Sequence, residues 1–240
     1  MKKKIFIIIP AYNTSHLIEE VIRRIPKIIW KKISRIVIIN DFSTDDTLKY
    51  IKKVSRNYSH IHVINKKKNE GYARAQKTGF IYSLKNHADI VILLHSDGQY
   101  APEEMTRLIK PLEKGQADVV QGSRMLGDAL KGKMPFYKYV ANRILSKLEN
   151  WVCGINVAEF HSGYMLYSRK ALETIPFMKL SDTFHFDGEM VFMTHKKGLR
   201  FKELVIPTRY AEEKSNLKPI KYGFQVLKIL WDYKRGKYNF

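Results

Sequence analysis

The chain has 240 residues, one cysteine and a formal net charge of +20, from 43 lysines and arginines against 23 acids. This length suits one large α/β domain or a domain with an appendage, and 45% hydrophobic residues exclude a disordered chain. A single cysteine excludes an internal disulfide bond and a cysteine-based zinc site. The positive charge suits three kinds of partner: nucleic acid, an anionic membrane or a phosphate-rich substrate.

The first residues do not resemble a targeting segment. Basic residues 1–4 precede an apolar run, residues 5–9, which stops at Pro10 and is too short for the core of a signal peptide. No window approaches the ~18 consecutive apolar residues of a membrane-spanning helix. We therefore expect a cytoplasmic protein that is peripheral at the cytoplasmic face of the membrane.

Apolar runs typical of buried strands alternate with segments of helical spacing. Strands are predicted at residues 5–9, 36–39, 61–64, 90–94 and 118–121. Helices are predicted at residues 17–25, 47–54, 72–84, 102–114, 134–151 and 220–233, with Thr14 or Ser15 and Ser43 or Thr44 capping the first two. The alternation predicts an α/β fold with a doubly wound, mostly parallel sheet and a C-terminal amphipathic helix.

Each predicted strand is followed at once by a polar cluster. The clusters are residues 10–13, 41–47, 69–71, 95–99 and 122–124. Because the carboxyl ends of parallel strands share one edge of a sheet, we expect a nucleotide site there. Neither of the glycine patterns G-x-G-x-x-G and G-x-x-x-x-G-K follows the first strand, so phosphate charge must be neutralised by a metal and by basic side chains such as Arg124.

The strand at residues 90–94 is expected to lie at the centre of the sheet and ends in His95, Asp97, Gly98 and Gln99. Asp97 offers a hard oxygen ligand where ligands bind in open α/β sheets. The alternative is that Asp97 only caps the following helix.

Four motifs in chain order resemble those of the inverting family-two glycosyltransferases of GT-A fold. They are Ile9-Pro10-Ala11-Tyr12-Asn13, Asn40-Asp41-Phe42-Ser43-Thr44-Asp45, Asn69-Glu70-Gly71-Tyr72-Ala73-Arg74-Ala75 and Ser96-Asp97-Gly98-Gln99. The resemblance covers residues 4–210 and is strongest to the branch that makes dolichyl- or polyprenyl-phosphate mannose or glucose. It implies a Rossmann-like nucleotide-binding half and a metal-dependent transfer reaction.

The resemblance also implies which residues form the donor site. The nucleotide-sugar pocket is expected to comprise Pro10, Ala11, Tyr12, Asn13, Asp41, Ser43, Asn69, Gly71, Arg74, Ser96 and Asp97. Asp97, with Gln99, is expected to hold Mn²⁺ or Mg²⁺ on the donor diphosphate. His95 replaces an aspartate of the family pattern, and imidazole favours Mn²⁺ over Mg²⁺. His95 either ligates the metal or bonds to ribose or to a metal-bound water.

Glu159 and Asp187 are the candidate catalytic acids of the second half. Residues 159–164 resemble the family's D-x-x-S-G-F segment, with glutamate in place of aspartate, and residues 184–190 resemble its acid-bearing turn before a helix. Either acid could be the general base for a hydroxyl acceptor or could contact the donor sugar, and Asp187 could instead be an N-cap. Arg124 is expected to help the metal neutralise the leaving diphosphate.

Two helices of the second half have alternative roles. The predicted helix at residues 134–151 packs on the core or, less favoured, faces the acceptor. The C-terminal helix at residues 220–233 docks on the domain or lies in an anionic membrane interface. The predicted organisation is a glycosyltransferase domain at residues 1–210, with a nucleotide-sugar half (1–124) and an acceptor half (125–210), followed by a polar linker and helix at residues 211–240.

These observations predict a metal-dependent inverting glycosyltransferase that moves one sugar from a UDP- or GDP-linked donor to a polyprenyl, dolichyl-type phosphate. The alternative acceptor is a hydroxyl of a surface glycan or glycolipid. We expect an anionic membrane surface as a partner and no nucleic acid. A different class is a basic, non-catalytic α/β protein that binds nucleic acid.

Overall fold

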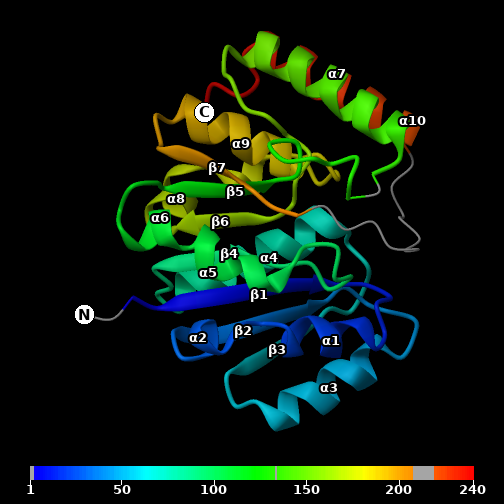
Figure 1. Ribbon diagram of the computed structural model, residues 1–240, viewed down its shortest axis with the longest axis vertical. Helices are drawn as coiled ribbons and strands as arrows, with labels where there is room; N and C mark the ends of the chain where they lie inside the picture. Colours follow the sequence, from blue (N-terminus) through cyan, green and yellow to red (C-terminus); the bar gives the residue numbers. More distant parts are fainter. Residues whose placement is uncertain (1–2, 133, 208–218) are drawn as a thin grey trace.

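A computed structural model describes residues 3–132, 134–207 and 219–240 of the chain as one sheet with helices on both faces (Figure 1). Within these ranges the sheet has seven strands in the order β3-β2-β1-β4-β6-β5-β7. They are β1 (Ile5–Ala11), β2 (Ile33–Asn40), β3 (Ile61–Asn65), β4 (Ile90–Leu93), β5 (Val119–Ser123), β6 (Met165–Ser168) and β7 (Phe201–Val205). The predicted doubly wound, mostly parallel sheet is confirmed, and β4 occupies its centre.

One strand of the sheet runs against the others. Strand β1 pairs in parallel with β2 and β4, β2 pairs in parallel with β3, and β5 pairs in parallel with β7. Strand β6 lies antiparallel between β4 and β5, and it was not predicted. Because β6 runs against its neighbours, it begins at the edge where the parallel strands end. The chain that precedes β6 therefore lies at the predicted site edge.

The helices occupy both faces of the sheet. They are α1 (Leu17–Arg23), α2 (Lys27–Trp30), α3 (Thr47–Asn57), α4 (Tyr72–Lys85), α5 (Met105–Leu108), α6 (Lys110–Glu113), α7 (Phe136–Cys153), α8 (Arg169–Thr174), α9 (Phe186–Lys196) and α10 (Pro219–Lys234), with single turns of 3₁₀ helix at Pro102–Glu104 and Phe177–Lys179. Most predicted helices are present, with shifts of a few residues at their ends.

Strand β1 contributes to two hydrophobic cores, one on each face of the sheet. Ile7 and Ile9 pack into one core with α1, α3 and α5, whereas Phe6 and Ile8 pack into the other with α4, α8 and α9. All four side chains are at most 3% exposed. A strand buried on both faces needs a continuous apolar run rather than an alternating one, and residues 5–9 have such a run.

Two local predictions are wrong. The helix expected at residues 102–114 is broken into a 3₁₀ turn, α5 and α6, because Pro111 has no N–H to continue the hydrogen-bond ladder. Thr14 and Ser15 do not cap α1, whose N-cap is His16. Their backbone N–H groups instead donate to the Thr47 hydroxyl, at 2.8 and 2.7 Å, and so join the loop after β1 to α3.

Helix α7 buries its polar face, whereas the favoured prediction was that its apolar face is buried. Its apolar residues Ile144 and Trp151 are 61% and 71% exposed, while the polar Ser146 and Glu149 are buried. The expectation that the apolar face packs on the core is therefore wrong. The inward face is polar because it carries groups that bond to the segment before β6, as when Phe160 donates its N–H to the Ser146 hydroxyl at 3.5 Å.

Helix α10 packs against α7 at one end of the molecule (Figure 1). One face buries Val226, Ile229 and Leu230, so the helix docks on the domain. The opposite face leaves large apolar side chains exposed, and these are Ile220, Phe224, Leu227 and Trp231. The predicted linker at residues 211–217 lies outside the described residues. No helix in the described ranges is both long and apolar enough to cross a membrane.

The end of β5 requires a glycine, which leads to a test of the packing. A Cβ atom at Gly122 would lie 2.8 Å from Ile206 Cγ2. Gly122→Ala should lower the free energy of unfolding by about 1–3 kcal/mol through overpacking. Gly223→Ala in α10 is the matched control, because nothing lies within 4 Å of its Cβ position. It should stabilise the helix by about 0.5–1 kcal/mol. Urea denaturation of both variants measures the difference, and equal stabilities would contradict the packing described.

Candidate active site

The polar clusters after β1, β2, β4 and β5 gather along the carboxyl edge of the sheet, on either side of the β1–β4 pair. At the centre, Asp97 follows β4 in a tight turn in which Gly98 has a φ of 76°. The backbone N–H of Gln99 donates to Asp97 Oδ1 at 3.1 Å. Asp97 is partly exposed and forms no ion pair with any residue that the structure describes. Its carboxylate therefore suits a cation supplied from solution.

The loops after β1 and β2 are bonded to each other. Asn13 donates its backbone N–H to the Ser43 hydroxyl at 3.1 Å, and its side-chain oxygen accepts the N–H of Thr44 at 2.9 Å. Ser43 in turn donates to Asn40 Oδ1 at 2.6 Å. Ser43 and Thr44 were predicted as helix caps, but they join these loops, and α3 has Asp46 as its N-cap. The pair of loops forms one wall of the predicted nucleotide pocket, where Pro10 and Ala11 end β1 and Tyr12 is 38% exposed.

Asp41 holds the turn that contains Asn69 and Gly71. The backbone N–H groups of Glu70 and Gly71 donate to its carboxylate, the latter at 2.7 Å, and Lys66 Nζ lies 3.0 Å from Oδ1. Gly71 has a φ of 90°, a conformation that favours glycine. Asp41 is only 3% exposed. Its carboxylate thus fixes the loop in which the predicted pocket residues lie.

Arg74 is directed away from Asp41. Its Nε donates to Asp182 Oδ2 at 2.6 Å, and Lys77 Nζ donates to the other oxygen of Asp182 at 2.7 Å. Arg74 therefore joins α4 to the segment before α9, and about half of its side chain stays exposed. Ser96, also predicted in the pocket, is buried at 4% exposure.

A chain of hydrogen bonds connects His95, next to the Asp97 turn, with Asp187. His95 Nε2 lies 2.7 Å from the Tyr72 hydroxyl, which donates to Asp187 Oδ2 at 2.7 Å. Gln76 donates to Asp187 Oδ1 at 3.1 Å. Because Tyr72 gives its one proton to Asp187, His95 Nε2 must carry the proton of the other bond, and in a neutral ring the lone pair is on Nδ1. Asp187 is 5% exposed, and burial raises its pKa.

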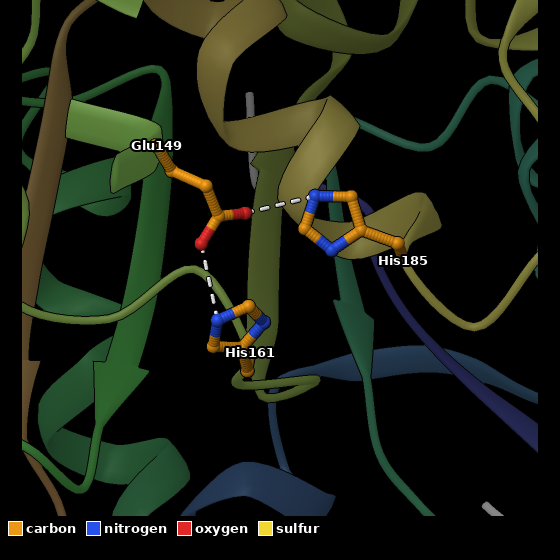
Figure 2. Close-up of side chains that lie close together, drawn as sticks. All are labelled: Glu149, His161 and His185. Carbon is orange, nitrogen blue, oxygen red and sulfur yellow. Dashed lines mark ion pairs between the residues drawn. The ribbon is translucent and has the colours of Figure 1, made fainter. Parts of the chain in front are cut away.

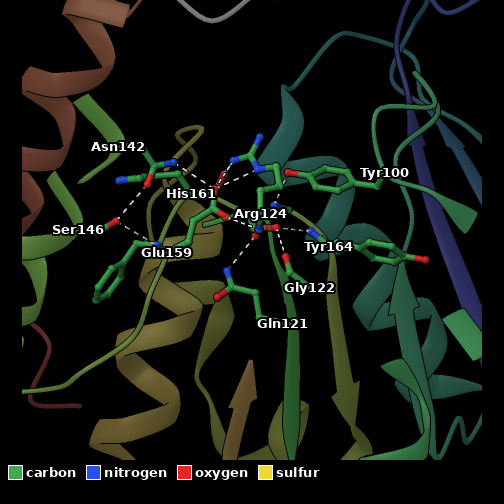
Figure 3. A network of polar contacts seen from close by, with 12 residues as sticks. Tyr100, Gln121, Gly122, Arg124, Asn142, Ser146, Glu159, His161 and Tyr164 are labelled. Atoms are coloured by element: carbon green, nitrogen blue, oxygen red, sulfur yellow. Dashed lines mark hydrogen bonds and ion pairs between the residues drawn. The ribbon is translucent and has the colours of Figure 1, made fainter. Parts of the chain in front are cut away.

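Glu159 and Arg124 form a buried pair at the end of β5 (Figure 3). Arg124 donates to Glu159 through Nε at 3.0 Å and through its backbone N–H at 2.9 Å, and Asn142 of α7 donates at 3.1 Å. Glu159 is fully buried, which would raise its pKa, but Arg124 lowers it. The guanidinium also lies 5.8 Å from the centre of the Tyr100 ring. Glu159 thus fixes the position of a cation at the site edge.

Some participants were missed in the sequence. Tyr72 and Tyr100 stand inside or next to the motifs at residues 69–75 and 96–99, so adjacency could have indicated them. These two tyrosines and His95 explain why position 163 is a glycine. The N–H of Gly163 donates to Tyr100 Oη at 2.9 Å, and a Cβ atom at this position would overlap the His95 ring and the Tyr72 hydroxyl. Asn142 gave no signal, because its role depends on the orientation of α7.

Comparisons with known proteins identify the family of this chain. The family model described as Glycosyl transferase family 2 matches residues 6–176. The UDP-N-acetylglucosamine–dolichyl-phosphate N-acetylglucosaminyltransferase of Methanococcus voltae is 27% identical over 98% of each chain. The polyprenol monophosphomannose synthase of Mycolicibacterium smegmatis is 23% identical, over 88% of this chain and 78% of that protein.

A solved structure gives the fold independently of close sequence similarity. Glucosyl-3-phosphoglycerate synthase from Mycobacterium tuberculosis, in complex with Mn²⁺, UDP-glucose and phosphoglyceric acid, superposes with a TM-score of 0.70. The identity is 18%, over 98% of this chain and 80% of that chain, so the likeness concerns the fold. With the match to the family model over residues 6–176, the conclusion is direct: this chain belongs to glycosyl transferase family 2 and is a glycosyltransferase of GT-A fold.

Proposed function

We propose that this glycosyltransferase moves a single sugar, with inversion, from a UDP- or GDP-linked donor to a polyprenyl phosphate at a membrane surface. Two relatives whose names specify dolichyl phosphate or a polyprenol support this acceptor class. The observation that carries the proposal is the exposed apolar surface of α7 and α10, beside the edge that holds Arg124. It comprises Phe136, Tyr137, Ile144, Trp151, Ile220, Phe224, Leu227 and Trp231.

Exposed apolar residues of this size, on two adjacent helices, suit a membrane interface. Phe224 and Trp231 share one face of α10, two turns apart, and are 69% and 62% exposed. Exposed basic residues accompany them: Arg143 and Lys147 on α7, and Lys221, Lys228 and Lys234 on α10. Lys234 Nζ lies 4.1 Å from the centre of the Trp151 ring, so positive charge and apolar surface are interleaved between the helices. Anionic headgroups complement this combination.

The donor diphosphate requires positive charge, and the chain offers two sources. Asp97 would hold Mn²⁺ or Mg²⁺, with His95 and Gln99 beside it, and the absence of an ion pair at Asp97 among the described residues suits that role. When bound, such an ion neutralises the leaving nucleoside diphosphate as a Lewis acid. Arg124, which is bonded to Glu159, would stabilise the same negative charge.

A phosphate acceptor does not need a general base, because its attacking oxygen is already anionic near neutral pH. Glu159 is fully buried and bonded on both oxygens, so we assign it the positioning of Arg124. Asp187 is bonded to Tyr72 and Gln76, and we assign it the orientation of His95 through Tyr72. A glycan hydroxyl as the acceptor would require one of these carboxylates to accept a proton. That requirement separates the two acceptor classes.

The metal role of Asp97 is tested by its removal. Asp97→Ala should lower transfer by at least roughly 10²–10³, because the charge on the leaving group loses its counter-ion. The Mn²⁺-dependent part of nucleotide binding, measured by calorimetry, should disappear as well. Asp46→Ala, an exposed acid before α3, is the matched control and should behave as wild type. Normal turnover of Asp97→Ala in the presence of EDTA would refute the metal-centred mechanism.

The acceptor class is tested directly with labelled donors. Radiolabel from UDP- and GDP-sugars should enter the organic phase when polyprenyl phosphate is supplied, but not when the unphosphorylated polyprenol is supplied. With this acceptor, Asp187→Asn should raise the donor KM and lower kcat by less than about tenfold, since no base is lost. A kcat loss of roughly 10²–10⁴ with unchanged donor affinity would identify Asp187 as a base and favour a hydroxyl acceptor.

The membrane surface is tested by point substitutions in α10. Truncation before α10 is unsuitable, because Ile229 and Tyr238 belong to the hydrophobic core. The double variant Phe224→Ser/Trp231→Ser should bind anionic vesicles at least about tenfold more weakly than wild type, since two aromatic side chains no longer enter the interface. Added salt should weaken the binding of both proteins.

Two controls accompany the vesicle co-sedimentation. Ile28→Ser changes an apolar residue of α2 that is 52% exposed, and it should not alter vesicle binding. Nucleotide affinity should stay the same in all variants. Equal sedimentation of the wild type and the α10 variant would remove α10 from the membrane contact.

A further inference from the structure

Three side chains that can bind a metal meet underneath α10, apart from the Asp97 turn. They are Glu149 of α7, His161 of the segment before β6, and His185 at the N-cap of α9 (Figure 2). One ligand atom from each lies within 4.8 Å of the other two. Glu149 and His185 are 1% exposed, and the His161 side chain is 9% exposed. Three distant parts of the sequence thus converge on one buried point.

Two close ion pairs join the members of this cluster (Figure 2). Glu149 Oε1 lies 2.9 Å from His185 Nε2, and Glu149 Oε2 lies 3.1 Å from His161 Nε2. All four atoms are buried, and the hydrogen-bond geometry at both contacts is poor. Each contact is an ion pair only while the imidazole carries a proton on Nε2. A metal ion bound to the same atoms would replace those protons.

Tyr222 of α10 contacts the opposite side of both imidazole rings. Its hydroxyl lies 2.7 Å from His161 Nδ1 and 3.1 Å from His185 Nδ1. A histidine that ligates a metal through Nε2 usually donates its other N–H to a neighbouring oxygen, which fixes the tautomer and the orientation of the ring. One tyrosine oxygen can accept both N–H groups. With Tyr222 as the acceptor at both Nδ1 atoms, both Nε2 atoms face Glu149 and can ligate a metal once they lose their protons.

We propose that Glu149, His161 and His185 bind one divalent ion of the Zn²⁺ class, separate from the metal of the donor site. Two imidazole nitrogens and one carboxylate oxygen are three donors of the type that Zn²⁺ prefers, and a solvent molecule would supply the fourth. Tetrahedral bonds of about 2.0–2.1 Å place neighbouring donors roughly 3.3 Å apart. The 2.9 and 3.1 Å contacts need only a small outward movement to reach this geometry.

The charge of the cluster agrees with this assignment. Glu149 forms ion pairs with both imidazole rings. An ionised carboxylate with two imidazoles is a ready ligand set for a dication. The ion would connect α7 with α9 and, through Tyr222, with α10. It would also stiffen the segment whose His161 carbonyl accepts a hydrogen bond from Arg124 at 2.8 Å.

The experiment uses untagged full-length protein that carries Asp97→Ala, so that the donor site does not bind the added metal. After chelator treatment and desalting, Zn²⁺ or Co²⁺ is added, and retained metal is measured by mass spectrometry. We expect one equivalent per chain, with the visible absorption of tetrahedral Co²⁺. At a free concentration about 100-fold above Kd, Tm should rise by roughly 5–10 °C.

Variants assign the ligands. His161→Gln and His185→Gln should each abolish retention and the rise in Tm, whereas His195→Gln, a partly exposed histidine of α9 outside the cluster, should leave both unchanged. Failure of the parent protein to retain Zn²⁺ or Co²⁺ would overturn the proposal. Glu149, His161 and His185 would then form a protonated ion-pair network without a metal. Retention that persists in His161→Gln and His185→Gln would overturn it equally. Because the first measurement uses the parent, a variant that fails to fold does not prevent a decision.

Discussion

The burial of β1 between parallel strands β2 and β4 fixes the positions of the loops that follow these three strands. Ile7 and Ile9 on one face and Phe6 and Ile8 on the other belong to separate cores. A shift of β1 by one residue would exchange these faces and expose one core to the wrong helices. The loops that leave β1, β2 and β4 are therefore held in one register, with Asp97 at the centre of the sheet.

The region around the end of β5 combines apolar packing with buried charge. Glu159 is fully buried and is satisfied by Arg124 and Asn142, so removing one partner would leave a buried charge uncompensated, at a cost of about 3–5 kcal/mol. The reversal of direction at β6 makes this possible, because it brings the preceding segment to the end of β5. Such a region is specified by a few polar contacts and depends strongly on each of them.

Much of the structure of residues 1–124 could be predicted from the sequence, because continuous isoleucine-rich runs and the polar residues that follow them are local signals. Predictions failed where a local sequence pattern is compatible with more than one structure. Thr14 and Ser15 have the composition of helix caps, yet their N–H groups bond to Thr47 on another helix. In α7 the amphipathic pattern is clear, but the polar face is the buried one, because Glu149 and its neighbours have polar partners that are distant in sequence. No periodicity could show those partners.

The hydrogen-bond chain from Asp187 through Tyr72 to His95 has a direction, and that direction can reverse. With Asp187 ionised, both bonds point towards it, and the His95 lone pair lies on Nδ1. If Asp187 takes up a proton, which its burial favours, the acid donates to Tyr72, and Tyr72 donates to His95 Nε2. The lone pair of His95 is then engaged at Nε2, and Nδ1 carries a hydrogen. The tautomer of His95, two residues before Asp97, therefore depends on whether Asp187 in α9 is protonated.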